Sequence, residues 1–295
     1  MKQDEQGNQN LDALQAAKPI VEGDAIPETL ENCIAELHAL VGLDNIKSEV
    51  ETLINLARVF ASRRRMGMPV PPMSHHLVLA GNPGTGKTTV ARIISKVYHI
   101  LGILSTNKFV EVDRSGLVAN FVGQTATKTK SVIDSALGGV LFIDEAYALT
   151  RGTMNDYGDE AIEVILKAME DNRGDLIIIV AGYSEKMAGF LEFNPGLKSR
   201  FRQTLVFPDY TPQQMCDIYL RMATTNGYRL DLEAQSALEA RLETVWKNRD
   251  ENFANARDVR NLFERTIARQ ADRIIAVGDY AVNALSLIKR EDIHA

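Results

Sequence analysis

The sequence predicts an α/β fold in which helices cover both faces of a five-stranded parallel sheet, followed by a small all-helical domain. Three observations indicate this fold. Five short apolar runs alternate with segments in which apolar residues recur at helical spacing, which is typical of parallel sheets buried on both faces. The first run leads directly into a glycine-rich segment of the form G-x-x-x-x-G-K-S/T. After residue 208 only helical patterns remain.

The chain before the first apolar run predicts a tail and two helices. Residues 1–27 are polar and show little periodicity, as expected of a mobile tail. Apolar residues at helical spacing predict one helix over residues 28–40 and a second from residue 46 to residue 65. A turn at residues 41–44 separates these two helices.

The order of the remaining elements follows from the apolar runs. The five predicted strands comprise residues 77–80, 109–112, 140–144, 176–181 and 204–207. Two prolines within residues 208–212 predict a hinge, and Thr211 and Pro212 are residue types that begin a helix. Three further helices are predicted over residues 215–226, 232–247 and 256–276. We therefore expect a tail at 1–27, an α/β domain at 28–208 and a helical domain at 209–295.

Composition and charge favour a soluble cytoplasmic protein. The chain has 295 residues, enough for two domains, with 45% apolar and 24% charged residues. The net charge of -6 argues mildly against nucleic acid as the main partner. Cys33 and Cys216 lack metal-ligand spacing, which favours buried thiols in a reducing compartment. Because no apolar run has membrane-spanning or secretory character, we expect no membrane partner.

The glycine-rich segment at residues 81–88 has the full spacing of a phosphate-binding P-loop. It lies between a predicted strand end and a predicted helix start, where backbone N–H groups and the helix dipole favour a triphosphate. Lys87 is expected to reach the β- and γ-phosphates, and the Thr88 hydroxyl to ligate Mg²⁺. The alternative is a glycine-rich turn that binds nothing. The expected nucleotide contacts of this loop are Asn82, Pro83, Gly84, Thr85, Gly86, Lys87, Thr88 and Thr89.

A pair of acidic residues ends the third predicted strand. Asp144 and Glu145 follow four apolar residues, so we expect both carboxylates at the edge of the sheet where ligands bind in open α/β folds. Asp144 would hold Mg²⁺, and Glu145 would polarise the water that attacks the γ-phosphate. The alternative is a solvated strand terminus. The second acid favours hydrolysis over simple nucleotide storage.

Two arginines are candidates for contacts to the phosphates. Arg200, before the fifth predicted strand, is a candidate arginine finger for an adjacent subunit, because nothing in its spacing directs it to Lys87. The alternative is a surface arginine beside Arg202. Arg257 begins a helix of the second domain and is expected to reach the nucleotide across the domain cleft. Arg260 is the competing choice, and a plain surface arginine is the alternative.

Phe121, Val122 and Gly123 form a candidate pore loop after the second predicted strand. An exposed aromatic residue beside an apolar residue and a glycine can grip a threaded chain. Phe121 could equally anchor the loop by packing, and spacing alone favours neither interpretation.

Several segments together resemble the AAA+ ATPases. They are GNPGTGKTT at residues 81–89, GGVLFIDEAY at 138–147, DYG at 156–158, AGY at 181–183, NPGLKSR at 194–200 and NAR at 255–257. More narrowly, FIDEAY, and NPGL followed by SR, resemble the group that contains the red-type Rubisco activases and the stage V sporulation protein K-like ATPases. The resemblance runs from about residue 40 to residue 274.

This resemblance implies a P-loop NTPase with a helical lid domain that forms a ring, usually a hexamer, with ATP and Mg²⁺ at the subunit boundaries. The roles it implies are chemistry by Lys87, Thr88, Asp144 and Glu145, an arginine finger in trans at Arg200, a second sensor at Arg257, an adenine pocket with Val41 and Gly42, and a pore-loop aromatic at Phe121. Two positions depart from the wider pattern. Tyr183 stands where many AAA+ proteins have the first-sensor Asn, and Phe121 stands where Tyr is commoner in the group.

The resemblance leaves several functions open. The activase branch uses a sugar bisphosphate effector, which should need basic groups near the pore. Residues 104–108 offer only Lys108 beside Arg114, and His76 is interpreted as a structural strand residue. We therefore favour a general ATPase that remodels a protein partner over a dedicated Rubisco activase. A non-threading ATP-dependent assembly switch is a further hypothesis, and action on nucleic acid is the weakest.

Overall fold

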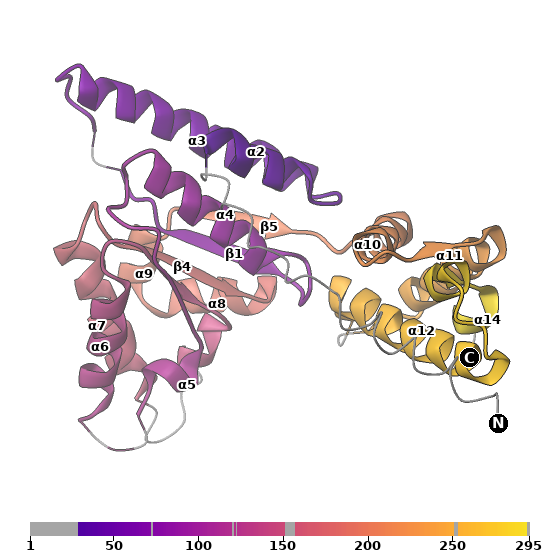
Figure 1. Ribbon diagram of the computed structural model, residues 1–295. Coiled ribbons are helices and arrows are strands. Elements are labelled where there is room, and N and C mark those ends of the chain that lie inside the picture. Colours follow the sequence, from indigo (N-terminus) through magenta and orange to yellow (C-terminus); the bar gives the residue numbers. More distant parts are fainter. Residues whose placement is uncertain are drawn as a thin grey trace, which may run out of the picture.

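A computed structural model describes residues 29–71, 73–119, 121, 123–150, 157–250 and 253–293. Figure 1 shows a larger α/β part and a smaller helical part, joined where the chain leaves the last strand of the sheet. The predicted tail at residues 1–27 lies outside the described residues. Within the described ranges, no helix combines the length and the apolar character that crossing a bilayer requires.

The sheet of the α/β part has five parallel strands, as predicted. They are β1 (Leu77–Gly81), β2 (Phe109–Val112), β3 (Val140–Ile143), β4 (Ile177–Gly182) and β5 (Gln203–Phe207), in the spatial order β2-β3-β4-β1-β5. Because the strands are parallel, they all end at one edge of the sheet, which we call the carboxyl edge, and all begin at the opposite amino edge. The connection after β1 carries the chain past β4 and β3 to the edge strand β2.

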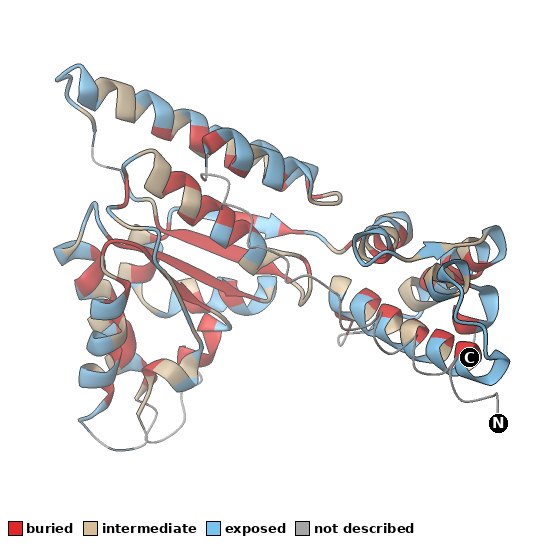
Figure 2. Cartoon of the chain, in the orientation of Figure 1, coloured by how far each residue is buried: buried red, intermediate tan, exposed pale blue. Residues whose placement is uncertain are grey.

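Helices cover both faces of this sheet, and each face has its own core. One face carries α2 (Leu30–His38), α3 (Asp44–Arg65) and α4 (Lys87–Ile100), and the other carries α5 (Arg114–Leu117), α6 (Thr125–Ala136), the 3₁₀ helix η1 (Ala146–Thr150), α7 (Gly158–Asp171), α8 (Ser184–Phe193) and α9 (Pro195–Arg200). Alternate residues of β1 divide between the cores: Leu77 and Leu79 join the first, and Val78 and Ala80 the second. Figure 2 shows the sheet as a buried layer between helices with exposed outer faces.

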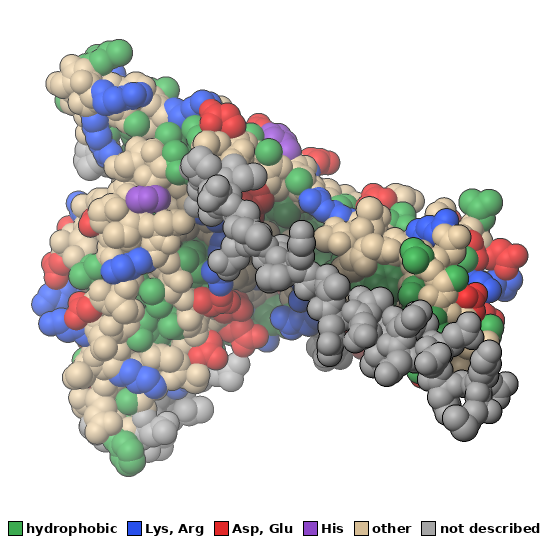
Figure 3. All heavy atoms as spheres, viewed as in Figure 1, with side chains coloured by type: hydrophobic (Ala, Val, Ile, Leu, Met, Phe, Trp, Pro, Cys, Tyr) green, Lys and Arg blue, Asp and Glu red, His purple; other side chains and the backbone are tan. Residues whose placement is uncertain are grey.

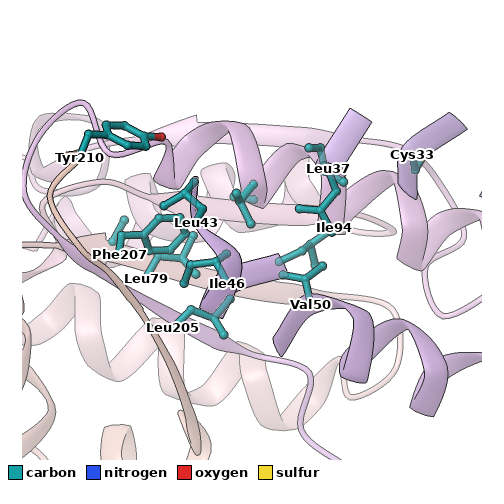
Figure 4. Close-up of a cluster of buried hydrophobic side chains, with 14 of the residues drawn as sticks. Cys33, Leu37, Leu43, Ile46, Val50, Leu79, Ile94, Leu205, Phe207 and Tyr210 are labelled. Carbon is teal, nitrogen blue, oxygen red and sulfur yellow. The ribbon is translucent and has the colours of Figure 1, made fainter. Parts of the chain in front are cut away.

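The first core attaches the N-terminal helices to the middle of the sheet. In Figure 4, Leu37 of α2 and Ile46 of α3 lie in one cluster with Leu79 of β1 and Phe207 of β5. Both α2 and α3 are anchored to the sheet in this way. The turn that connects them lies near the carboxyl edge, where Val41 and Leu43 line a cavity. Both cysteines, Cys33 and Cys216, are buried free thiols in the same core, as predicted.

Side-chain caps explain where two helices begin. The Thr29 hydroxyl accepts a hydrogen bond from the Asn32 N–H at 3.2 Å, so α2 begins at Leu30 rather than at the predicted residue 28. Thr211 and Gln214 form a capping box with proline in the first turn of α10 (Pro212–Thr225). The residue types at this position predicted that helix start, although the apolar pattern alone placed it three residues later.

The smaller part is helical, as predicted, but it also contains a strand pair. It consists of α10, α11 (Leu232–Lys247), α12 (Ala256–Val277), α13 (Val282–Ser286), α14 (Arg290–Ile293) and the parallel strands β6 (Arg229–Leu230) and β7 (Leu287–Ile288). Strands of two residues are too short to give a periodic pattern, which is why the sequence predicted helices alone. The Gln270 amide of α12 donates to the carbonyls of Leu285 and Leu287 at 3.0 Å each and so holds β7 against that helix.

Candidate nucleotide-binding site

A cavity of about 880 Å³ lies at the carboxyl edge of the sheet, between the α/β part and the helical part. Its walls come from the P-loop, the end of β3, the turn between α2 and α3, and the helices α10 and α12. Figure 3 shows acidic and basic side chains on either side of the hollow between the two parts. The volume is within the range of pockets that bind cofactors.

The glycine-rich segment forms a loop between β1 and α4, as predicted. Gly84 and Gly86 have φ values of +71° and +95°, which residues with side chains rarely adopt. The predicted contacts that line the cavity are Pro83, Gly84, Gly86, Lys87, Thr88 and Thr89. Asn82 and Thr85 are not among the described residues that line it. The buried Thr85 hydroxyl instead donates to Asn82 O at 2.8 Å and shapes the loop from within.

Lys87 is held by the backbone of its own loop. The Nζ atom donates to Gly81 O and Asn82 O, at 2.8 Å in each case. Burial lowers the pKa of Lys87 below its ordinary value, Asp144 acts in the opposite direction, and Arg257 lowers it further. Asp144 and Arg257 therefore act in opposite directions on the charge of Lys87.

Asp144 and Glu145 both line the cavity, as their position at a strand end predicted. β3 ends at Ile143, one residue earlier than predicted, so Asp144 is the first residue beyond the strand. The Glu145 N–H donates to Asp144 Oδ1 at 3.0 Å. Glu145 has a φ of +48°, a strained value for a residue with a side chain, and such strain is often found at functional sites. Asp144 is half-buried, whereas Glu145 is exposed.

This set of groups fits a nucleoside triphosphate with a divalent cation. The Lys87 ammonium and the N–H groups of a glycine-rich loop are donors for phosphate oxygens. The Thr88 hydroxyl and the Asp144 carboxylate, which line the same cavity, are the oxygen ligands that Mg²⁺ prefers.

Arginines enter the cavity from the helical part. Arg257 and Arg260, on the first turns of α12, both line the cavity, so the predicted residue and its competitor lie in the same site. Arg257 is the better candidate for a contact near the P-loop, because a Cβ atom added at Gly84 would lie 2.9 Å from its backbone nitrogen. Arg221 of α10 also lines the cavity and donates to Ala39 O. Arg221 could not be predicted from the sequence, because an arginine within an amphipathic helix matches no motif.

One wall of the cavity is largely apolar. It contains Leu40, Val41, Leu43, Ile218 and Met222. The predicted residue Gly42 is absent from the described lining. It has a φ of +58°, and a Cβ atom there would collide with the Gln214 side chain. Tyr183 lines the cavity just beyond β4, and its ring lies 6.0 Å from that of Tyr147.

Arg200 lies far from this cavity within its own chain. It ends α9, directly before β5, and therefore lies at the amino edge of the sheet. Its Nη2 atom is 3.2 Å from Glu170 Oε2, and its Nε atom is buried with no partner within the described part of the chain. As the spacing indicated, nothing brings Arg200 to Lys87 in cis.

Phe121 lies between α5 and α6, with 69% of its side chain exposed. This exposure contradicts the interpretation of Phe121 as a packed loop anchor. Gly123 has a φ of +76° and open space around it. Val122 lies outside the described residues.

Residues 104–108 and His76, which were considered in relation to an effector, are not among the described residues that line the cavity. Residues 104–108 precede β2 and so lie at the amino edge, opposite the cavity, where Ser105 donates to Asp175 at 2.9 Å. His76 is structural, as predicted: it is buried, and its Nδ1 atom accepts from the Ile178 N–H at 2.9 Å.

Comparison with known proteins agrees with this geometry. Residues 77–209 match the ATPase family associated with various cellular activities (AAA), and residues 211–295 match the AAA lid domain. The chain is 41% identical to stage V sporulation protein K of Bacillus subtilis (strain 168) over 259 residues, which cover 88% of this chain and 80% of that protein. It is 40% identical to the chloroplastic ribulose bisphosphate carboxylase/oxygenase activase of Cyanidioschyzon merolae over 272 residues, 91% of either chain.

The fold also matches solved structures. A RuvB mutant from Thermotoga maritima superimposes with a TM-score of 0.59 at 22% identity, covering 87% of this chain and 70% of that one, which is a likeness of fold alone. The P-loop, the acid pair, the lid and the two relatives all indicate the same family. The chain belongs to the AAA family of ATPases, in the group that contains stage V sporulation protein K and the red-type Rubisco activases.

Proposed function

We propose that this protein binds ATP and Mg²⁺ in the cavity and uses ATP hydrolysis to remodel a protein partner, as a ring of identical subunits. The observation that carries the proposal is the convergence of Lys87, Asp144 and Glu145 on one cavity. A cation for the phosphates, a carboxylate for the metal and a second carboxylate for the water are the groups that ATP hydrolysis requires.

Each residue of the cavity has a separate role in hydrolysis. Lys87 binds the β- and γ-phosphate oxygens, and Thr88 and Asp144 hold Mg²⁺, which neutralises phosphate charge when bound. Glu145 orients the attacking water and accepts its proton, a contribution of about 10²–10⁴ to the rate. Arg257 binds phosphate from the side of the lid.

The apolar wall is the place for the adenine base. Val41 lines this wall, and Gly42 permits the turn that carries it. Tyr183 lines the cavity at the end of β4, and we assign its hydroxyl to the first-sensor position. A tyrosine hydroxyl can donate to phosphate as an asparagine amide does.

Coupling to a partner rests on two residues outside the cavity, Arg200 and Phe121. Arg200 completes the site of a neighbouring subunit, and a ring provides such a neighbour at every boundary. Phe121, with Val122 and Gly123, is the candidate grip on a polypeptide in the centre of the ring. The exposure of Phe121 supports this role, because a grip must be accessible.

Two substitutions separate hydrolysis from grip. Glu145→Gln should keep ATP binding, slow hydrolysis by about 10²–10⁴ and trap the partner on ATP-bound rings when they are incubated with a cell extract. Adding Phe121→Ala should abolish the trapping. Phe193→Ala is the matched control, because Phe193 is an exposed aromatic residue at the end of α8. Equal trapping by the Phe121→Ala and Phe193→Ala forms would contradict the grip.

A second candidate function is activation of Rubisco, which the 40% identity to the chloroplastic activase favours. ATP-dependent recovery of carboxylase activity from inhibited red-type Rubisco would establish it.

The third candidate function, a non-threading assembly switch, also makes a distinct prediction. If Glu145→Gln fully supports the function in cells, ATP binding alone is sufficient, and the protein is a non-threading assembly switch.

A further inference from the structure

Asn255, the residue directly before α12, has an unusual backbone. Its φ of 51° and ψ of -123° belong to a region that favours glycine, and its side chain is fully buried at 0% exposure. A residue with a side chain is held in such a conformation only when its surroundings compensate for the strain.

The Asn255 amide connects three segments of the chain. Its Oδ1 atom accepts the Tyr210 N–H at 2.9 Å, in the connection between β5 and α10. Its Nδ2 atom donates to Asp209 Oδ1 at 2.8 Å and to Pro83 O, in the P-loop, at 3.2 Å. Both N–H bonds and the carbonyl of the amide are thus used, which is expected of a fully buried polar group.

Further bonds join the same segments around this amide. Asp209 Oδ1 also accepts from Asn82 Nδ2 at 2.9 Å. The Ala256 N–H donates to Gly84 O at 3.2 Å, and the Tyr210 hydroxyl donates to Thr85 O at 3.2 Å. The carbonyls of three consecutive P-loop residues, 83 to 85, are therefore all bound by donors from the hinge and lid side of the chain.

This arrangement fixes the direction of the loop's N–H groups. In a planar trans peptide the C=O of one residue and the N–H of the next point in opposite directions. Holding the carbonyls of Pro83, Gly84 and Thr85 toward the lid and hinge therefore turns the N–H groups of residues 84, 85 and 86 the other way. Those N–H groups are the ones that a P-loop offers to a triphosphate.

We propose that Asn255 and Asp209 form a latch that couples the position of the lid to the orientation of the phosphate-binding N–H groups. Asn255 is a positioning residue that acts through the Pro83 and Gly84 peptides. A rotation of α12 that breaks the latch releases these peptides and, at the same time, moves Arg257 away from Lys87. A single conformational equilibrium then determines both the position of the lid and the affinity for nucleotide. The proposal rests on the proposed nucleotide site.

The test compares two substitutions of the same residue. Asn255→Gly removes the amide and its three hydrogen bonds, and relief of the positive-φ strain should offset part of the resulting loss of stability toward urea. We expect the Kd for a fluorescent ADP analogue and the KM for ATP to rise about tenfold or more, because the loop loses its orientation. Asn255→Asp should bind more weakly still, since a second carboxylate would face Asp209 and Pro83 O.

Two further variants complete the design. Asp209→Asn added to Asn255→Asp restores a donor and acceptor pair, so part of the lost affinity should return. Asn261→Asp is the matched control, because Asn261 is exposed on the same helix, and it should bind ADP and hydrolyse ATP like the wild type.

The outcomes separate the latch from the nucleotide site itself. A wild-type protein that neither binds nor hydrolyses ATP contradicts the proposed function. If the wild type is active and Asn255→Gly keeps wild-type Kd and KM, the latch is wrong. A loss of urea stability in Asn255→Gly with unchanged Kd and KM would likewise show that Asn255 is only structural.

Discussion

At the scale of single residues, burial separates the tasks of the charged groups that meet in the cavity. Lys87 is held by two carbonyls of its own loop, and burial lowers its pKa. Asp144 is half-buried, and its Oδ1 atom accepts the Glu145 N–H. Glu145 is exposed. Lys87 and Asp144 are therefore held in place, whereas Glu145 is free to move. This is what we expect if Asp144 binds the metal and Glu145 orients the attacking water.

His76 gives the fold a specific sensitivity to acid. Burial, followed by the nearby positive charges of His75, Arg200 and Arg173, lowers its pKa from 6.5 to about 4. Above about pH 6.5 the imidazole is neutral in the folded and unfolded states and adds no pH dependence. Between about pH 6.5 and pH 4 only the unfolded state takes up the proton, so stability falls as the pH falls.

The substitution His76→Asn tests this prediction. An asparagine oxygen can accept the Ile178 N–H in place of Nδ1, but it does not titrate. Between about pH 7.5 and pH 5, we expect the wild type to lose about 2 kcal/mol more unfolding free energy than the variant does, measured by urea titration. Comparing each protein with itself at the two pH values cancels the packing cost of the substitution. Parallel loss in both proteins would contradict the prediction.

Residues whose role depends on local sequence could be predicted, whereas those that depend on distant partners could not. Lys87 and Asp144 are set by neighbours along the chain, because a loop or a strand end carries them to the carboxyl edge. Asn255 contacts Pro83 across 172 positions of sequence. For His76 a structural role was predicted, but its partner Ile178, 102 positions away, was not. A single sequence contains no signal for such pairs. The sequence did mark the position of Asn255, because it begins the NAR segment at residues 255–257 that resembles the AAA+ ATPases.

At the scale of elements, the apolar runs predicted all five strands because helices cover both faces of this sheet and the three central strands are fully buried. Runs of this kind do not reveal spatial order, so the sequence could not place β1 between β4 and β5. This order matters for the site. It brings the P-loop after β1 next to Tyr183 after β4, and β4 in turn lies beside β3, which carries Asp144. β6 and β7 were missed because they have two residues each.

The pairing of β1 and β5 leaves no room for a side chain at Gly81. A Cβ atom there would lie 2.5 Å from Phe207 O and 2.8 Å from Phe207 Cβ. Gly81→Ala must therefore push the strands apart. We expect a loss of about 1–3 kcal/mol in unfolding free energy by urea titration. We also expect a higher KM for ATP, because Gly81 O is one of the two carbonyls that hold Lys87.

The matched control is the same substitution in an open position. Gly189 lies on the exposed side of α8, and a Cβ atom there would meet nothing within 4 Å. Gly189→Ala should stabilise the protein by about 0.5–1 kcal/mol, since alanine is the better helix former, and should leave the KM unchanged. Equal stability of the two variants would show that β1 and β5 can separate without cost.

At the scale of the whole molecule, the parallel sheet itself separates Arg200 from the nucleotide site. Lys87 follows β1 at the carboxyl edge, and Arg200 precedes β5 at the amino edge. The five residues of β1 span roughly 17 Å, which is beyond the reach of an arginine side chain. An Arg200 that acts on ATP must therefore act on the ATP of another subunit. Within its own chain, Arg200 contacts Glu170 on α7.

Mixing two inactive variants tests this separation. Lys87→Ala should abolish ATP binding, and Arg200→Ala should slow hydrolysis by about 10³ or more. In randomly mixed rings of equal parts, about a quarter of the boundaries pair an intact Lys87 with an intact Arg200 from the adjacent subunit. Steady-state ATP hydrolysis should therefore reappear on mixing, to a substantial fraction of the wild-type rate.

The neighbouring arginine provides the control for this experiment. Arg202 is exposed and donates to Ser199 O at 3.2 Å, so Arg202→Ala should hydrolyse ATP like the wild type without any mixing. Exchange of subunits can be verified with differently labelled chains. If labelled subunits of Lys87→Ala and Arg200→Ala exchange and hydrolysis stays at the level of the separate variants, Arg200 does not act across the boundary. The site at the carboxyl edge would then have to be complete within one chain, with Arg257, Arg260 or Arg221 as its cation.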